Sequence, residues 1–254
     1  MKRKTMFSVA LMIASVVLLL ISMPVHASKM DDSIESSAKK SYVFKTYLKA
    51  DDIKVKSEDG VVVLTGTVSE ESHKSLAHDT VASLPGVKSV DNRLEVKGEH
   101  SAEKSDAWIT TKVKTTLLFH RSVSAITEVN TKDGVVTLKG EADNLAEKDL
   151  TTEYAKDVDG VKDVKNEMTV AKTPKKKTDD TAGEKIDDAS ITALVKMSLF
   201  SHRSTSAVNT KVVTDNGVVA LSGKAKNAAE KDLVTKLVKD IKGVKSVNNQ
   251  MTVE

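Results

Sequence analysis

The chain has 254 residues, with 39 Lys and Arg against 36 Asp and Glu. The whole positive excess lies in Lys2, Arg3 and Lys4, and removing these three leaves 36 bases against 36 acids. A balanced surface argues against a nucleic-acid partner, because binding to a phosphate backbone requires a cationic surface. The absence of cysteine excludes disulfides, thiolate catalysis, Cys-ligated zinc and an acyl anchor on a leading cysteine.

The first 27 residues have the pattern of an export signal. Met1 to Thr5 is basic, Met6 to Met23 is apolar, and Val25 and Ala27 supply the small residues that a signal peptidase reads. We therefore expect a signal peptide over residues 1–27, cut after Ala27, and a periplasmic protein. The apolar stretch is long for such a signal, so an uncleaved inner-membrane anchor is the alternative.

The rest of the chain repeats one pattern three times. Each copy has an Asp-Gly or Asn-Gly pair before an alternating apolar strand, a glycine six residues later and a Gly-Val-Lys-x-Val signature twenty residues further. Identical spacings in all three copies predict three homologous small domains. We interpret the repeated glycines as turn and cap residues: Gly60, Gly66, Gly86, Gly134, Gly140, Gly160, Gly217, Gly223 and Gly243.

The local signals within each copy predict the order αββαβ. An amphipathic helix comes first, the Asp/Asn-Gly pair favours a tight hairpin turn, and the next helix opens at Ser69, at Asn144-x-x-Glu147 or at Asn227-x-x-Glu230. A strand, a helix and a further strand pair in parallel through a right-handed crossover. The fold class is therefore α+β, with three tandem modules, each a three-stranded mixed sheet with two helices on one face. We place the modules at residues 30–97, 105–171 and 187–254, with a flexible linker at 172–186.

These repeated residues carry a family resemblance. The first-helix pattern Ile-x-x-x-Val, the Asp/Asn-Gly-Val-Val turn and strand, and Gly-Val-x-x-Val-x-Asn together resemble the BON domain. An exported chain of such domains is similar to the OsmY-like periplasmic proteins, although these commonly have two of the domains and this chain has three. The resemblance implies a role in osmotic or general envelope stress, contact with phospholipid surfaces or envelope proteins, and no catalysis.

The side chains that support catalysis or metal binding do not form a recognisable motif. The histidines that follow the export signal lack metal-ligand spacing, and there is no Walker loop, nucleophile elbow or dinucleotide fingerprint. We therefore expect a protein that is not an enzyme and that uses no cofactor and no metal.

One residue departs from the repeat. Trp108, the only tryptophan, lies in the first helix of the second copy, where the other copies have Ser33 and Ser190. An aromatic ring among cations on one helix suits a membrane interface, because an indole lies at headgroup depth while the cations attract phosphates. The expected lipid-binding residues are Trp108, Lys112, Lys114, Phe119 and Arg121. Packing of Trp108 between units and incidental exposure are the alternatives.

A second local pattern, His-Arg-Ser, ends the first helix in the second and third copies, at His120 and His202. We interpret it as favourable positive charge at the C-terminus of its own helix, with a shared contact to an anion as the alternative. The function expected overall is a non-enzymatic periplasmic stress protein that binds anionic phospholipid surfaces. The alternative is a chaperone-like module that binds envelope or unfolded proteins without lipid. The sequence leaves the oligomeric state open.

Overall fold

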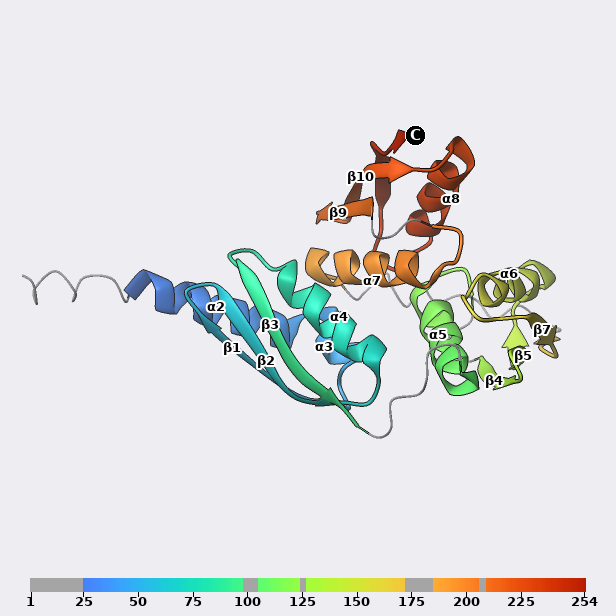
Figure 1. Ribbon diagram of the computed structural model, residues 1–254, viewed down its shortest axis with the longest axis horizontal. Helices are drawn as coiled ribbons and strands as arrows, with labels where there is room; N and C mark the ends of the chain where they lie inside the picture. The colour runs from blue at the N-terminus through green and yellow to red at the C-terminus, as the bar shows by residue number, and fades with distance from the viewer. Residues whose placement is uncertain (1–24, 98–104, 124–126, 172–184, 206–208) are drawn as a thin grey trace, which may run out of the picture.

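The computed structural model describes residues 25–97, 105–123, 127–171, 185–205 and 209–254, with side chains from residue 29 onward (Figure 1). It contains three successive αββαβ units, as the sequence predicts. In Figure 1 the first unit is blue to teal, the second green to yellow and the third orange to red. Met1 to Pro24 of the predicted signal, residues 98–104 between the first two units and residues 172–184 of the predicted linker lie outside the described residues.

The first unit contains one short helix more than predicted. Its central strand pairs antiparallel with the strand before it and parallel with the last strand, which makes the expected mixed sheet. The elements are α2 (Val25–Lys40), α3 (Tyr42–Thr46), β1 (Asp52–Glu58), β2 (Val61–Val68), α4 (Glu71–Ala82) and β3 (Ser89–Val96).

The second and third units share this topology, but their last strand is divided into two short segments. The second unit comprises α5 (Asp106–Phe119), β4 (Glu128–Lys132), β5 (Val135–Lys139), β6 (Glu141–Ala142), α6 (Leu145–Lys156), β7 (Asp163–Asn166) and β8 (Thr169–Val170). The third comprises α7 (Asp188–Ser201), β9 (Thr210–Asp215), β10 (Val218–Ala225), α8 (Ala228–Lys239), β11 (Ser246–Asn249) and β12 (Thr252–Val253).

The repeated asparagine near the end of each unit explains the final sequence signature. In the second unit, the side-chain amide of Asn166 donates to the carbonyl of Lys148 in α6 and to Thr152 Oγ1, while its carbonyl oxygen accepts from the amide of Met168. Asn249 makes the same set of bonds in the third unit. In the first unit His78 stands where Thr152 does, and β3 continues without a break. The bond to threonine is therefore found in the two units whose last strand is divided and not in the first unit.

The hairpin turns are held by a carboxylate from the first helix of the same unit. Asp59 has φ of 51° and Gly60 of 79°, as a type I′ turn requires. The Asp31 carboxylate accepts from the amides of both turn residues, at 2.9 and 3.0 Å. Asp106 and Asp188 bind the turns of the other two units in the same way. All nine glycines assigned to turns and caps have positive φ.

Two of the three predicted caps of the second helix are present. Asn144 Oδ1 accepts from the amide of Glu147, and the Glu147 carboxylate accepts from the amide of Asp143, the residue before the cap, in a variant of the capping box. Asn227 and Glu230 repeat this arrangement. The prediction for Ser69 was wrong: α4 has Glu70 at its N-cap without a side-chain bond, and the Ser69 hydroxyl contacts His73 Nδ1 instead.

The three units are packed together rather than strung out. One apolar core joins the first and third units and includes Phe119 from the second, while the other joins the second unit to Leu237 of α8. In Figure 1, α7 lies between α4 of the first unit and α5 of the second, and residue contacts link it to both. The small units therefore stabilise one another, as expected for domains of this size.

Candidate functional site

The helices α5 and α7 occupy equivalent places in their units, but the first unit covers α7 along one face and contacts α5 through Phe119 at its end. The amide of Val43 in α3 donates to Ser190 Oγ at 3.0 Å, and Lys196 in α7 pairs with Asp79 of α4 at 3.1 Å. The α7 residues on the covered face are all buried: Ser190, Ala193, Leu194 and Met197.

The equivalent face of α5 has a different composition. Its residues correspond in order to the covered set of α7 and are all partly exposed: Trp108, Thr111, Lys112 and Thr115. A second copy of the first unit could not bind here as it does on α7, because an indole replaces Ser190 and an ammonium group replaces the buried Leu194. The α5 face is therefore amphipathic where its counterpart is apolar.

The α5 face extends to an aromatic ring of the third unit. The Lys112 Nζ lies 5.4 Å from the centre of the Trp108 ring and 4.8 Å from that of Phe200 in α7. Both distances are within the range of cation–π attraction. Phe200 is 66% exposed, an unusual exposure for a large apolar side chain. Hereafter the α5 face means Trp108, Thr111, Lys112 and Thr115 together with Phe200.

The five residues expected to bind lipid do not form one exposed set. Trp108 and Lys112 are half-buried, and Lys114 is exposed on the same helix. Phe119 is 1% exposed, because its ring packs edge-on against Tyr47 of the first unit, so in this arrangement it is part of an interface between units. Arg121 is exposed but contacts the third unit through its terminal nitrogen.

The interpretation of the His-Arg-Ser pattern as charge at the end of its own helix was wrong. Each copy contacts the second helix of the other unit. His120 Nδ1 lies 3.2 Å from Asp240, which ends α8, and His202 Nε2 lies 3.1 Å from Asp157, which ends α6. The amides of Arg121 and Arg203 donate to the carbonyls of the same two aspartates. The second and third units thus exchange equivalent contacts across an approximate twofold axis.

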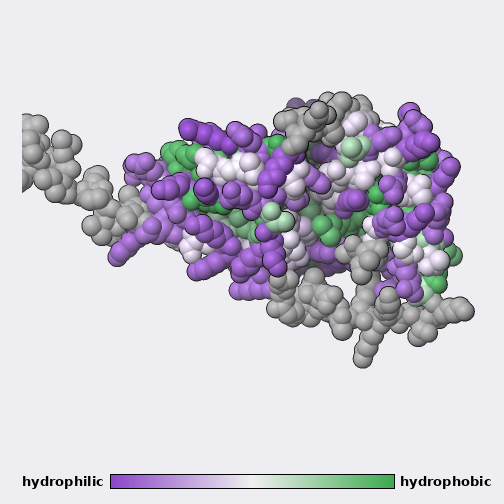
Figure 2. Space-filling model, turned by 90° about the horizontal axis from the view of Figure 1, so that it is seen from below, coloured by the Kyte–Doolittle hydropathy of each residue, from purple (hydrophilic) through white to green (hydrophobic). Residues whose placement is uncertain are grey.

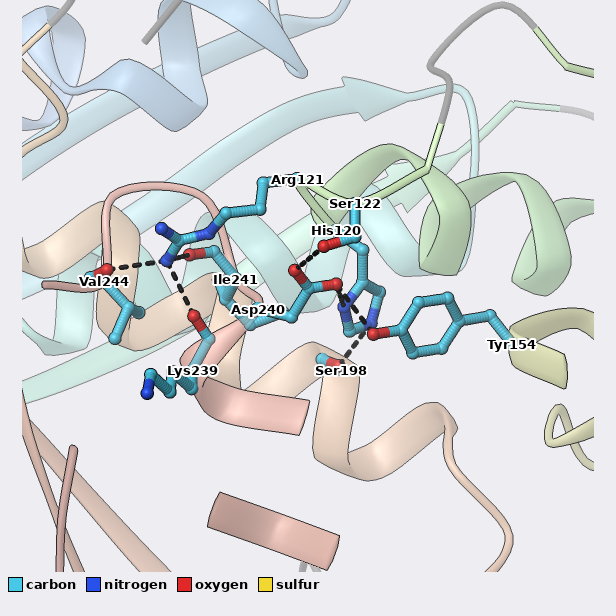
Figure 3. A network of polar contacts seen from close by, with 9 residues as sticks. All are labelled: His120, Arg121, Ser122, Tyr154, Ser198, Lys239, Asp240, Ile241 and Val244. Atoms are coloured by element: carbon cyan, nitrogen blue, oxygen red, sulfur yellow. Dashed lines mark hydrogen bonds and ion pairs between the residues drawn. The ribbon is translucent and has the colours of Figure 1, made fainter. Parts of the chain in front are cut away.

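The half of this junction around Asp240 forms a dense polar network (Figure 3). The Asp240 carboxylate accepts from Ser122 Oγ and, at 2.7 Å, from the Tyr154 hydroxyl, and it faces His120. The His120 ring is fully buried and stacks on the Tyr154 ring at 3.9 Å between centres. Ser198 Oγ of α7 lies 3.3 Å from His120 Nε2 on its other side.

The environment of these groups shifts their ionisation. Burial of Asp240 opposes its ionisation, but the bonds from His120, Ser122 and Tyr154 outweigh that effect and hold the pKa of its carboxyl below the ordinary value. Burial, the bond to Asp240 and the charge of that carboxylate raise the pKa of Tyr154 far above its ordinary value. Tyr154 therefore stays a neutral donor to a carboxylate, which suits a structural lock better than proton transfer.

Sequence reasoning missed the partners in this network. Tyr154, Asp240 and Ser198 come from three different helices or helix ends, and only tertiary packing brings them to His120. The repeated His-Arg-Ser triplet was the available signal, since two copies at equivalent helix ends indicate a shared structural use. Its target could not be read from the sequence because the contacts join residues far apart in the chain, as Arg121 and Lys239 or Tyr154 and Asp240 are.

Within the described residues, no group of three or more histidine, aspartate or glutamate side chains could hold a metal ion. The same residues contain no helix that is long and apolar enough to cross a membrane.

A family model described as "BON domain" matches residues 30–98, 105–172 and 187–254. The chain belongs to the BON domain family. The resemblance seen in the sequence is thus confirmed over three BON units. One similar protein is the osmotically-inducible protein Y of Escherichia coli, 37% identical over 145 residues, which are 55% of this chain and 72% of that protein. Another is the outer membrane lipoprotein DolP of Haemophilus influenzae, 32% identical over 162 residues, which are 64% of this chain and 74% of that protein.

Proposed function

We propose that this chain is a non-enzymatic BON protein of the bacterial cell envelope that acts in osmotic or general stress and binds anionic phospholipid surfaces through the α5 face. The envelope role is supported by the two relatives, one named for osmotic induction and one for the outer membrane. A periplasmic location, with residues 1–27 removed as a signal peptide, is part of the proposal.

The α5 face is the observation that carries the lipid-binding part. In the third unit the equivalent helix face is apolar and covered by the first unit, whereas here it combines two aromatic rings, an ammonium group and two hydroxyls and is partly exposed. Aromatic rings lie at headgroup depth while lysine attracts anionic phosphate. Lys114 adds a further exposed cation on the same helix. Phe119 and the terminal nitrogen of Arg121 hold units together and are not assigned to this surface.

The contact is expected to be peripheral and weak. Each surface cation contributes about 1 kcal/mol near an anionic membrane, and screening by salt reduces this attraction. On the side of the molecule seen in Figure 2, hydrophilic residues cover most of the described surface, with apolar patches between them. A mixed surface of this kind suits reversible contact with headgroups.

The test is co-sedimentation with vesicles containing phosphatidylglycerol, compared with vesicles of phosphatidylcholine alone. We expect the wild type to bind the anionic vesicles, salt to weaken the binding, and Trp108→Ala and Lys112→Glu each to reduce it several-fold. Lys39→Glu is the matched control, since it makes the same charge change at an exposed position of α2, the equivalent helix of the first unit. Equal binding by all variants, or none by the wild type, would rule out this role for the α5 face. If the protein does not bind vesicles but suppresses the aggregation of an unfolded protein, the chaperone-like alternative is favoured.

A further inference from the structure

A cleft at the junction of the second and third units collects positive charge. It has a volume of about 380 Å³ and lies where the end of α5 meets the last turn of α8. Four of the six lining residues are cationic: Arg121, Lys236, Lys239 and Lys245. Among the described residues, none of these four makes an ion pair.

The one acid in the cleft is already occupied. Figure 3 shows the Asp240 carboxylate turned towards Ser122, His120 and Tyr154, on the side away from the Arg121 guanidinium. The carboxylate accepts hydrogen bonds from Ser122 and Tyr154 and lies in ion-pair distance of His120. With four cationic side chains against this one carboxylate, the cleft has a net positive charge.

Arg121 is held in place within the cleft. One terminal nitrogen donates to the carbonyls of Lys239, Ile241 and Val244, at 2.7, 3.0 and 2.6 Å. These bonds fix the guanidinium plane against the turn after α8 (Figure 3). Within the part of the chain that the structure describes, the Nε–H and the other terminal nitrogen of Arg121 make no hydrogen bond or ion pair, and the side chain is exposed. A guanidinium whose geometry is fixed loses little entropy when its remaining donors bind a planar or tetrahedral anion.

The approximate twofold axis supplies an internal comparison. The positions equivalent to Arg121, Lys239 and Lys245 are Arg203, Lys156 and Lys162, which keep their charge. The position equivalent to Lys236, however, is Glu153, which pairs with Lys156 at 3.1 Å. The fold therefore does not require four cations here. Positive charge is concentrated at the end of α8 and not at the equivalent end of α6.

We propose that the Arg121 cleft is an anion-binding site that takes a phosphate group, with the guanidinium of Arg121 as the fixed donor and Lys236 and Lys239 as mobile cations. Lys245, whose ammonium group also donates to the carbonyl of Asn216 at 3.0 Å, adds positive charge at the edge of the site. The phosphate can belong to a free phosphate compound or to a lipid headgroup. The site differs from the α5 face in residues and place, so it does not depend on the proposed function.

The first arm of the test uses inorganic pyrophosphate as the free anion. The full chain is titrated at low ionic strength by calorimetry, with the Arg121 Nε–H resonance followed by NMR. We expect saturable binding, a shift of that resonance, and binding about tenfold weaker in Lys239→Glu, because charge reversal replaces an attraction with a repulsion. Lys156→Glu is the matched control at the equivalent exposed position of α6 and should bind as the wild type does. Lys236→Glu is a second variant and should repeat the loss.

The second arm uses phosphatidylglycerol vesicles with the same variants and with Trp108→Ala. Loss of pyrophosphate binding in Lys239→Glu but not in Lys156→Glu supports a site for free phosphates. If Lys239→Glu but not Lys156→Glu loses binding to vesicles while pyrophosphate binding is unchanged, the result supports a site for lipid headgroups. The proposal is overturned if neither probe binds, or if Lys239→Glu and Lys156→Glu behave alike with both probes. Unchanged vesicle binding by Trp108→Ala would instead count against the α5 face and would leave the Arg121 cleft untouched.

Discussion

The two halves of the junction between the second and third units have the same plan and different strength. Around Asp240, whose side chain is 14% exposed, three side chains converge, and His120 is fully buried. Around Asp157, 39% exposed, only His202 among the described side chains makes an equivalent approach. One substitution in the repeat explains part of the difference, since Tyr154 of α6 stands where α8 has Leu237, which has no hydroxyl to donate. A duplicated contact can thus diverge into one firm lock and one loose one.

Removing each aspartate in turn tests most directly whether the two halves of the junction contribute differently to stability. Asp240→Ala leaves His120 and Tyr154 buried without their partner, and we expect the free energy of unfolding to fall by about 3 kcal/mol. Asp157→Ala, at the more exposed half, should cost less than about 1 kcal/mol because water replaces the lost partner. Urea unfolding followed through Trp108, the only tryptophan, measures both. Equal losses would show that the two halves do not differ energetically.

A smaller effect is expected from Tyr154→Phe, which keeps the ring stacked on His120 and removes the 2.7 Å bond to Asp240. A hydrogen bond to a charged group contributes about 1.5 kcal/mol, so the variant should lose that amount. The double variant of Tyr154→Phe with Asp240→Ala should lose clearly less unfolding free energy than the sum of the losses in the two single variants, because both substitutions remove the same bond. Full additivity would mean that Tyr154 acts independently of Asp240.

The smallest effect is a difference in acid sensitivity. Because its bonds hold the pKa of Asp240 below the ordinary value of about 3.9, the ionised carboxylate is favoured in the folded state. Its contribution is complete above about pH 5 and is lost as the pH falls through about 4 and below. The groups that face it are His120 and Tyr154, with Arg121 nearby.

Asp240→Asn lacks this titration, so its melting temperature should fall less between pH 5 and pH 3 than that of the wild type. Thermal unfolding monitored by circular dichroism at each pH measures this difference. The control is Asp157→Asn, since the approach of His202 also holds the pKa of Asp157 below the ordinary value and this carboxylate is more exposed. A wild type and an Asp240→Asn variant that lose stability in parallel would contradict the assignment.

The fold of one unit can be read from the amino-acid sequence. Its signals are local or periodic, so they can be recognised along the sequence. They are the Asp-Gly and Asn-Gly turns, the caps at Asn144 and Asn227 and the apolar stripe Ile109, Val113 and Leu117. Three copies with equal spacing then predicted the topology of each mixed sheet. The same reading found Trp108 as the departure from the repeat.

The way in which the units meet depends on contacts that the sequence does not reveal. That Phe119 packs on Tyr47, that His120 contacts Asp240 and that α7 is covered while α5 is partly exposed all depend on side chains far apart in the chain. Such contacts leave no periodic trace, because each involves a single side chain on an otherwise ordinary helix. The physical reason is that hydrophobic burial fixes which faces must be covered but does not say which neighbour covers them.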